Sequence, residues 1–420
     1  MRLESLGVLI VYSALMKHLI VPEILLPNAG VDLAAWAALA CDQYTQDRAY
    51  WERAAEARAG KPSTLSLVLP EVFLNDADKP LRVAAIHRAM RDYLASGVFA
   101  EPFRGFIYVE RSTAYGRKRK GIVAAIDLEA YDWNPAKKAH IRASEATVPE
   151  RLPPRTEIRR NAPLELPHVM LLANDPLKRL VEASGARVRA KPPLYSTALL
   201  PDSGHIIGWD IQDAEMLQAT ERALSELEAE NTVGGDCLLF AVGDGNHSLA
   251  AAKAVWDEYK AQRPADTAHP LRYALVEIVN IYDEGLTFEP IHRVLFGADA
   301  GELAAALGEA FGKAVTRDSG GTVFRVAQDA GGGLAVSRLQ PVLDSFLAAR
   351  PAAKIDYIHG EAEALRLTRG AGAAGIILPP VAKGGFFSTI RERGALPRKS
   401  FSLGEASEKR FYLECRRIHA

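Results

Sequence analysis

The order of strand and helix signals along this chain predicts a mixed fold of the α+β (mixed α/β) class. Short apolar runs typical of strands alternate with segments of helical period, but they do so irregularly rather than as the repeated unit of a doubly wound sheet. The 420 residues are also long for one hydrophobic core. They contain no internal repeat and no linker of low complexity. We therefore expect several lobes that pack on one another.

Four segments describe this organisation. Residues 1–18 are predicted to be an extension, followed by an N-terminal α+β lobe (19–139), a central lobe (140–297) and a C-terminal α/β lobe (298–420). The N-terminal lobe is predicted to contain strands at 19–26 and 65–72, helices at 32–40, 48–59 and 80–96, and a hairpin of 106–111 with 120–127.

The central lobe is predicted around one strand, turn and helix. Elements expected before it are a short helix at 155–161, a strand at 169–172, a hairpin of 194–200 with 205–210 and a helix at 213–231. Residues 272–281 predict a further strand, paired directly beside the apolar run 237–242. The C-terminal lobe is predicted to include strands at 334–339 and 411–416 and a β-α-β unit over 355–378.

The central turn has the composition of an anion-binding site. It reads Gly243-Asp244-Gly245-Asn246-His247-Ser248 and lies between a buried apolar run and a helix with Leu249, Ala252, Trp256 and Tyr259 on its apolar face. Backbone N–H groups and the positive end of the dipole at a helix N-terminus favour an anion, and glycines let a ligand approach the backbone closely. The structural alternative is an ordinary helix cap, with Asp or Asn as the capping residue and Gly as the turn residue.

A second charged segment, residues 140–172, interleaves arginines with glutamates. Arg142, Arg151, Arg155 and Arg159 are accompanied by Glu145, Glu150, Glu157 and Glu165. The functional interpretation is a set of guanidinium groups around a phosphate or carboxylate, with Glu145 buried among them. The alternative is a salt-bridged surface helix. His292-Arg293 either reaches the central turn or ties down the end of a strand.

Overall charge argues against nucleic acid as the main partner. The net charge is −1 at pH 7, and the basic run Arg117-Lys118-Arg119-Lys120 is expected to be a solvated hairpin tip, with a phosphate-bearing ligand as the alternative. Cys41, Cys237 and Cys415 form no C-x-x-C motif, which favours a reducing, cytoplasmic compartment. A lone Cys41 beside apolar residues is more typical of a core position than of a nucleophile. The apolar run Leu6–Leu15 is too short to span a membrane.

Several motifs together resemble a known family. GDGNHSLAAAKAVW, WAALACDQYTQ, IRASEAT, RLPPRTEIRRNAPLELPHVMLL, FEPIHRVL and LPRKSFSLGEASEKRF, in their order here, are similar to the bacterial domain-of-unknown-function family numbered 1015. The resemblance runs from about Leu19 to the C-terminus. In most of this family the turn reads D-G-H-H-R, which is similar to the strand-turn-helix box of the ParB/sulfiredoxin-like fold and, more remotely, to the D-G-H-H turn of free-serine kinases. Asn246 stands in place of the first histidine of that box, and Ser248 in place of its arginine.

This resemblance implies a ParB-like core and a nucleotide-dependent phosphotransferase acting on a small hydroxylated metabolite such as free serine. It implies Glu145 as the base, by correspondence with a P-H-E segment of the kinases, and the turn as a phosphate cradle. Asp244 would then hold Mg²⁺ and His247 would donate to a phosphoryl oxygen of ATP or ADP. A P-loop kinase is excluded because no glycine-lysine loop of that type is present.

Two other hypotheses stay open. One is a non-catalytic protein that binds a nucleotide or metabolite in the same pocket, which the replacement of the arginine by Ser248 favours. The other is a ParB-like nucleic-acid-binding module, against which the near-zero net charge counts. The oligomeric state is not predicted.

Overall fold

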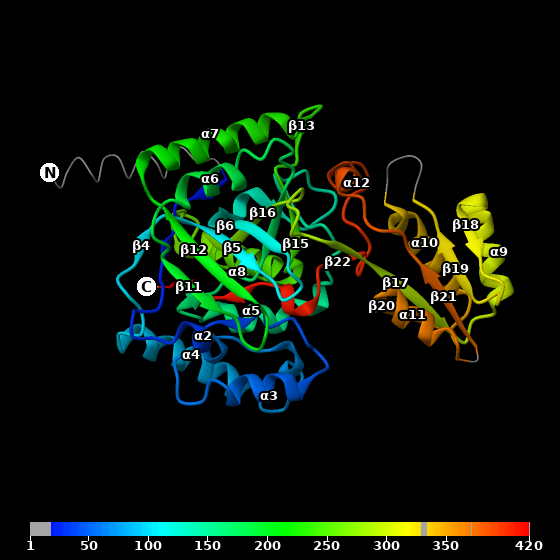
Figure 1. Ribbon diagram of the computed structural model, residues 1–420, viewed down its shortest axis with the longest axis horizontal. Helices are drawn as coiled ribbons and strands as arrows, with labels where there is room; N and C mark the ends of the chain where they lie inside the picture. Colours follow the sequence, from blue (N-terminus) through cyan, green and yellow to red (C-terminus); the bar gives the residue numbers. More distant parts are fainter. Residues whose placement is uncertain (1–17, 329–333, 371, 420) are drawn as a thin grey trace. The chain divides into compact units, whose positions relative to one another are not determined.

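The computed structural model describes residues 18–328, 334–370 and 372–419 (Figure 1). Contacts between Cα atoms divide the chain into two compact units. Unit 1 comprises the residues up to Ala143, Thr147–Leu286 and the residues from Glu405 onward. Unit 2 comprises Ser144–Ala146 and Thr287–Gly404. Both units contain helices and sheets, which confirms the predicted mixed α/β class.

Unit 1 is built on a ten-stranded mixed sheet. In spatial order the strands are β11 (Tyr195–Ala198), β12 (His205–Ile211), β5 (Phe106–Ser112), β6 (Lys118–Asp127), β16 (Tyr273–Asn280), β10 (Met170–Ala173), β15 (Phe240–Asp244), β8 (Ile141–Arg142) and β7 (Tyr131–Asp132), with β1 (Leu19–Ile20) paired to β6. The central strands are buried on both faces, so they read in sequence as continuous apolar runs.

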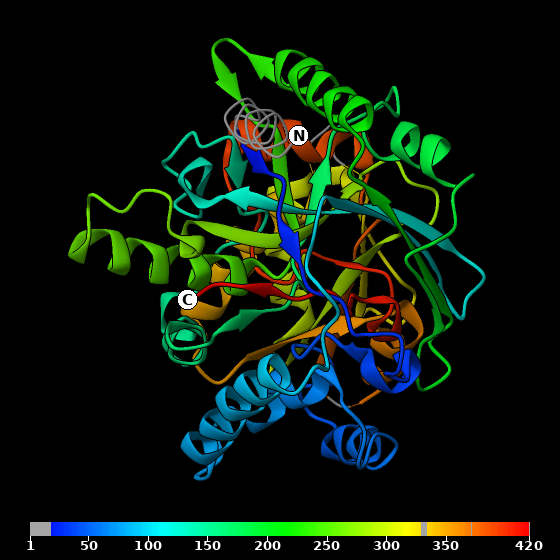
Figure 2. The same ribbon diagram turned by 90° about the vertical axis from the view of Figure 1, so that its left-hand side faces the viewer.

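Unit 1 also contains helices, some of which pack directly on this sheet. They are α2 (Leu33–Trp36), α3 (Arg48–Glu56), α4 (Lys79–Ala95), α5 (Pro153–Arg160), α6 (Val181–Val188), α7 (Ala214–Glu230) and α8 (Asn246–Gln262). Helix α6 packs on β5, β6 and β12, α7 packs on α6, and α5 packs on α8. Figures 1 and 2 place α7 at one end of unit 1 and α3 and α4 at the opposite end.

Short strand pairs bring distant segments of unit 1 together. They are β2 (Glu23–Ile24) with β4 (Phe103–Arg104), β3 (Ala38–Leu39) with β23 (Phe411–Tyr412), β9 (Leu164–Glu165) with β24 (Arg416–Arg417), and β13 (Thr232–Val233) with β14 (Asp236–Cys237). The last residues of the chain are therefore part of unit 1 and not of the preceding α/β unit.

Unit 2 is a smaller α/β structure. Its six-stranded sheet has the order β18 (Val315–Arg317), β19 (Val323–Val326), β21 (Ala373–Ile377), β17 (Phe288–Phe296) and β20 (Lys354–His359), with β22 (Phe401–Leu403) also paired to β17. Its helices are α9 (Ala300–Phe311), α10 (Ala335–Ala348), α11 (Glu361–Leu367) and α12 (Phe386–Arg393). The predicted β-α-β unit corresponds to β20, α11 and β21. Its two strands lie on either side of β17 in the sheet.

The division into units differs from the predicted lobe boundaries at 139/140 and 297/298. Strands β5 and β6 from the predicted first lobe hydrogen-bond into the same sheet as β10, β15 and β16 from the predicted second. Most of the predicted extension, residues 1–17, lies outside the described residues.

Several local predictions were wrong. The single strands predicted at 19–26 and 411–416 are each divided into two short strands, β1 and β2 in the first case and β23 and β24 in the second. Strand β16 does not pair directly beside β15, because β10 lies between them and pairs with both. Residues 65–72 form 3-10 turns at Thr64–Leu67 and Glu71–Phe73, where Pro70 interrupts the apolar run. Residues 334–339 open helix α10, whose buried Ala335, Val336, Leu339, Gln340 and Leu343 recur at helical spacing. The helix predicted at 32–40 ends at Trp36, because Ala38–Leu39 pairs with β23.

Candidate functional site

A strand, a turn and a helix follow one another in unit 1 as predicted, but with other bounds. The run predicted as one strand, 237–242, is divided between β14 and β15, and of the predicted turn only Gly245 lies outside β15 and α8. Strand β15 ends at Asp244, Gly245 follows with φ +81°, and Asn246 begins the 17-residue helix α8. A Cβ atom at Gly245 would lie 3.0 Å from Cγ2 and 3.1 Å from Cα of Val169. Only glycine fits here without strain, both for its left-handed conformation and for the close approach of the neighbouring strand. Part of the glycine signal in the sequence is therefore structural.

Asp244 is fixed by two contacts. Its Oδ1 accepts a hydrogen bond from the Gly245 N–H at 3.0 Å, and its Oδ2 lies 3.3 Å from Nζ of Lys409. Lys409 is buried, while Asp244 remains partly exposed. Each carboxylate oxygen keeps a free lone pair, but a cation bound to Asp244 would be repelled by the nearby Lys409 ammonium. The donor set around this aspartate therefore fits a metal ion poorly.

Further polar residues, which the sequence analysis did not single out, surround this pair. Asp42 Oδ2 lies 3.9 Å from His168 Nε2, and His168 Nδ1 lies 2.9 Å from the hydroxyl of Tyr412. Burial by itself would raise the pKa of Asp42, but His168, a hydrogen bond from Gln43 and the charge of Lys409 outweigh it and lower the pKa overall. We call Asp42, His168, Asp244, Lys409 and Tyr412 the Lys409 cluster.

A cavity of about 150 Å³ adjoins this cluster within unit 1. Its wall includes Ser248 and Leu249 from the first turn of α8, apolar side chains, and the polar residues Cys41, Glu71, Arg155, Arg159, Glu165, His168 and Tyr412. Two buried nitrogens of wall residues, Nε of Arg159 and Nε2 of His168, have no hydrogen-bond partner within the described chain. Buried polar atoms are rarely left without a partner, so these two nitrogens favour a polar ligand in the cavity.

The predicted arginines are not gathered around one point. Each of three lies against its own carboxylate, Arg142 against Asp236, Arg155 against Glu71, and Arg159 against Glu165 at 2.7 Å. Arg155 and Arg159 line the cavity together with Ser248. Arg142 lies in β8, and Arg151 ends the 3-10 turn Pro149–Arg151 with its side chain exposed. Arg142 is therefore an ion-paired residue of a buried strand rather than of a surface helix, whereas Arg155 and Arg159 are wall residues of the cavity.

His247 lies in the first turn of α8. Its Nε2 accepts a hydrogen bond from the backbone N–H of Val148 at 3.2 Å. This bond ties the arginine-rich segment to the turn within unit 1. A donor role for His247 toward a phosphoryl group would have to come from Nδ1, because Nε2 acts as an acceptor here.

Glu145, His292 and Arg293 belong to unit 2, whereas the turn belongs to unit 1. The Glu145 carboxylate accepts hydrogen bonds from the backbone N–H groups of Ser400 at 2.9 Å and Lys399 at 3.3 Å. Burial raises the pKa of Glu145 despite these bonds. The carboxylate therefore holds the loop before β22, and a pKa raised toward neutrality also suits a general base.

The contacts of His292 and Arg293 are structural within unit 2. His292 Nδ1 accepts from the Leu378 N–H at 3.2 Å, directly after β21, which matches the expectation of a residue that ties down a strand end. Arg293 donates to Oε1 of Gln340 and stacks over the ring of Tyr357. Burial lowers the pKa of Arg293 to about 10.

The basic run in β6 is not a solvated hairpin tip. Arg117 pairs with Glu408, Lys118 with Glu110, Arg119 with Glu277 and Lys120 with Asp283. Arg119 is only 3% exposed. Glu110 lies on the other strand of the same hairpin, whereas Glu408, Glu277 and Asp283 are distant in sequence, so local spacing could not reveal those three.

Cys41 lines the cavity but is a poor nucleophile. Its thiol lies 3.1 Å from the hydroxyl of Tyr412, and burial raises its pKa to about 12. At neutral pH the thiol is therefore almost wholly protonated, and the thiolate is the reactive form.

Comparison with known proteins now identifies the family. The family described as "Protein of unknown function (DUF1015)" matches residues 25–372, and the chain belongs to it. No curated protein matches the sequence. Among the described residues, no helix combines the length and apolar character needed to cross a membrane.

Solved structures give weaker likenesses. A conserved hypothetical protein from Pyrococcus furiosus is 12% identical with a TM-score of 0.31, covering 69% of this chain and 90% of that one. A mutant free serine kinase in complex with AMP is 12% identical with a TM-score of 0.34, covering 66% and 86%. C-terminally truncated SbnI from Staphylococcus aureus is 9% identical with a TM-score of 0.33, covering 67% and 82%.

Proposed function

We propose that unit 1 binds a small hydroxylated metabolite in the cavity and the phosphate of a nucleotide at the turn Gly243–Ser248, and that the protein transfers a phosphoryl group between them. The observation that carries this proposal is the cavity itself. It reaches the first turn of α8, and two of its wall residues, Arg159 and His168, each carry a buried nitrogen without a hydrogen-bond partner in the described chain. Its volume is about 150 Å³, and both polar and apolar residues form its wall.

In the transfer, the hydroxyl oxygen of the metabolite attacks the terminal phosphorus of ATP or ADP. A new P–O bond forms, the bond from phosphorus to the bridging oxygen breaks, and ADP or AMP leaves. The hydroxyl proton passes to a carboxylate base. Such a reaction depends mainly on positioning and neutralisation of charge. The N-terminus of α8 and the Lys409 ammonium supply positive charge beside Asp244.

Serine with ATP or ADP is the first substrate pair to test, because a free serine kinase with bound AMP or ADP is among the similar structures. Purified full-length protein is incubated with each nucleotide, with and without Mg²⁺, and phosphoserine is measured directly. Asp244→Asn keeps the size of the side chain and removes its charge. Because Asp244 holds the Lys409 ammonium in place, we expect this variant to lower the transfer rate by about 10²-fold through misplacement of that charge. Asp257→Asn on the exposed face of α8 is the matched control and should retain the rate.

A second variant tests the base. If Glu145 accepts the proton, Glu145→Gln lowers the transfer rate by about 10²–10⁴-fold. Full activity in Glu145→Gln would show that Glu145 only holds the loop before β22. Stability is measured in parallel by urea unfolding, so that a folding defect is not mistaken for a lost base.

Non-catalytic binding is the second candidate function, and the contacts of Glu145 favour it. Its carboxylate already accepts backbone hydrogen bonds from Lys399 and Ser400. Thermal stabilisation of the protein by nucleotide, without transfer to any hydroxylated metabolite, would support this second candidate and contradict the first. Indifference to every nucleotide would contradict both.

A further inference from the structure

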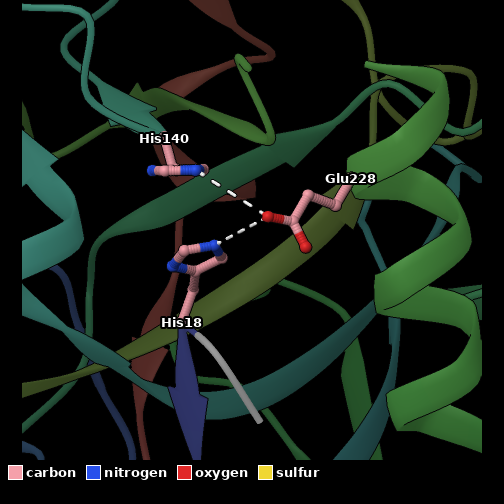
Figure 3. Close-up of side chains that lie close together, drawn as sticks. All are labelled: His18, His140 and Glu228. Atoms are coloured by element: carbon pink, nitrogen blue, oxygen red, sulfur yellow. Dashed lines mark hydrogen bonds and ion pairs between the residues drawn. The ribbon is translucent and has the colours of Figure 1, made fainter. Parts of the chain in front are cut away.

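A different group of side chains in unit 1 has the composition of a metal site. His18 directly precedes β1, His140 directly precedes β8, and Glu228 lies in the last turn of α7. These residues are far apart in the sequence. Figure 3 shows both imidazole rings directed at the same carboxylate oxygen of Glu228.

The separations suit an ion better than direct hydrogen bonds. Oε1 of Glu228 lies 3.5 Å from Nε2 of His18 and 3.8 Å from Nε2 of His140, and the three potential ligand atoms all lie within 4.8 Å of one another. An N–H···O hydrogen bond spans about 2.7–3.2 Å. By contrast, ligands bound tetrahedrally at about 2.0–2.1 Å are separated from one another by about 3.3–3.4 Å. Small side-chain rotations would therefore bring all three atoms to the same ion.

The backbones that carry the ligands are already fixed. The carbonyl of His18 accepts a hydrogen bond from the Asp127 N–H at 2.9 Å, and the carbonyl of His140 accepts from the N–H groups of Leu239 and Phe240. The carbonyl of Glu228 accepts from the Thr232 hydroxyl at 2.6 Å. The two rings lie 4.2 Å apart at an interplanar angle of 31°. A site with fixed backbones loses little conformational freedom when an ion binds.

Access and ligand type point to one class of ion. The His140 side chain is 39% exposed, which leaves an entry path, while those of His18 and Glu228 are 13% and 19% exposed. Two imidazoles and one carboxylate are typical ligands of zinc and similar divalent transition metals, whereas Mg²⁺ and Ca²⁺ prefer oxygen ligands only. Three protein ligands leave a fourth position for water.

We propose that His18, His140 and Glu228 bind one zinc-type divalent cation, which clips the start of β1 to β8 and to the end of α7. This site is separate from the Lys409 cluster and does not depend on the proposed phosphotransfer. The ion would join three segments that are distant in sequence.

The test uses the full-length protein without an affinity tag, stripped with a chelator. Zn²⁺ is titrated calorimetrically, the metal content after dialysis is measured, and Co²⁺ is added as a spectroscopic probe. We expect saturable binding of one ion per chain, a rise in melting temperature with Zn²⁺ but not with Mg²⁺, and the visible absorption of four-coordinate Co²⁺.

Variants decide whether these residues are the ligands. His140→Ala and Glu228→Gln should each abolish the saturable binding and the thermal shift, while His205→Ala, a histidine on the hairpin strand β12, should retain both. Glu228→Gln is nearly isosteric and keeps the test available if His140→Ala folds poorly. Absence of saturable Zn²⁺ binding, or binding that survives in both variants, would overturn the proposal.

Discussion

Lys409 and Arg410 are neighbours in sequence, yet they belong to two polar regions of opposite character. Lys409 faces Asp244 in the Lys409 cluster beside the cavity. Arg410 enters a network with Glu277, Glu414, Arg119 and Tyr195, which we call the Glu277 network. Arg410 contacts Glu277 and Glu414 at 2.5 Å each, and both carboxylates are at most 1% exposed.

The two regions differ in how completely their polar groups are paired within the protein. In the Glu277 network each carboxylate is paired with a buried arginine, and Tyr195 donates a further hydrogen bond to Glu414. In the Lys409 cluster, Asp244 and Asp42 are partly exposed, and Nε2 of His168 has no hydrogen-bond partner in the described chain. A saturated buried network serves folding, whereas an unsaturated cluster beside a cavity can bind a ligand.

The largest loss of stability is expected when Glu277, the central carboxylate of the Glu277 network, is truncated. Glu277→Ala leaves Arg410 and Arg119 buried without their shared carboxylate. We expect a loss of about 3–5 kcal/mol in the free energy of unfolding, measured by urea denaturation. Glu258→Ala, which removes an exposed partner of Arg160, is the control and should change stability by about 0–1 kcal/mol. Equal losses of unfolding free energy in Glu277→Ala and Glu258→Ala would show that the buried Glu277 network stabilises the protein no more than an exposed ion pair does.

A smaller effect on stability is expected at the cluster. Lys409→Met keeps the length of the side chain but leaves Asp244 without its cation, in a partly hydrated place. We expect a loss of about 1–3 kcal/mol in unfolding free energy, together with weaker nucleotide binding in calorimetry. Unchanged nucleotide binding would remove Lys409 from the proposed site.

The pH dependence of the unfolding free energy tests whether the ionised Glu277 carboxylate stabilises the fold. Burial alone would raise the pKa of Glu277, but Arg410 and Arg119 outweigh it and hold the pKa below its usual value of 4.5. The stabilisation by this carboxylate is therefore present above pH 4.5 and is lost as the pH falls through the pKa of the folded state. Glu277→Gln should make the decline in unfolding free energy below pH 4.5 shallower than in the wild type. An unchanged acid slope would contradict this.

The smallest effect on ligand binding is expected for substitution of Cys41. Because its pKa is raised to about 12, iodoacetamide should alkylate it much more slowly at neutral pH in the folded protein than in urea. Mass spectrometry of the Cys41 peptide measures both rates. Cys41→Ser should leave nucleotide binding unchanged. Rapid alkylation of the folded protein would restore Cys41 as a candidate nucleophile.

The local pattern of the sequence was sufficient to predict that a strand, a glycine turn and a helix (β15 to α8) follow one another. It was also sufficient to predict the hairpins β5–β6 and β11–β12. Period and turn composition are properties of neighbouring residues, so they can be read without knowing the fold. The motifs CDQYTQ, LELPHV and GEASEKRF contain Asp42, His168 and Lys409, but nothing in their spacing indicates that these side chains meet.

Only the tertiary structure decided which charges are paired and where a site can form. It inserted β10 between β16 and β15, returned residues 405–419 to unit 1, and gave each of Arg142, Arg155 and Arg159 a carboxylate partner. It also brought His18, His140 and Glu228 together. Such contacts depend on chain segments that are far apart in sequence, and no local pattern encodes which distant segment will be the neighbour.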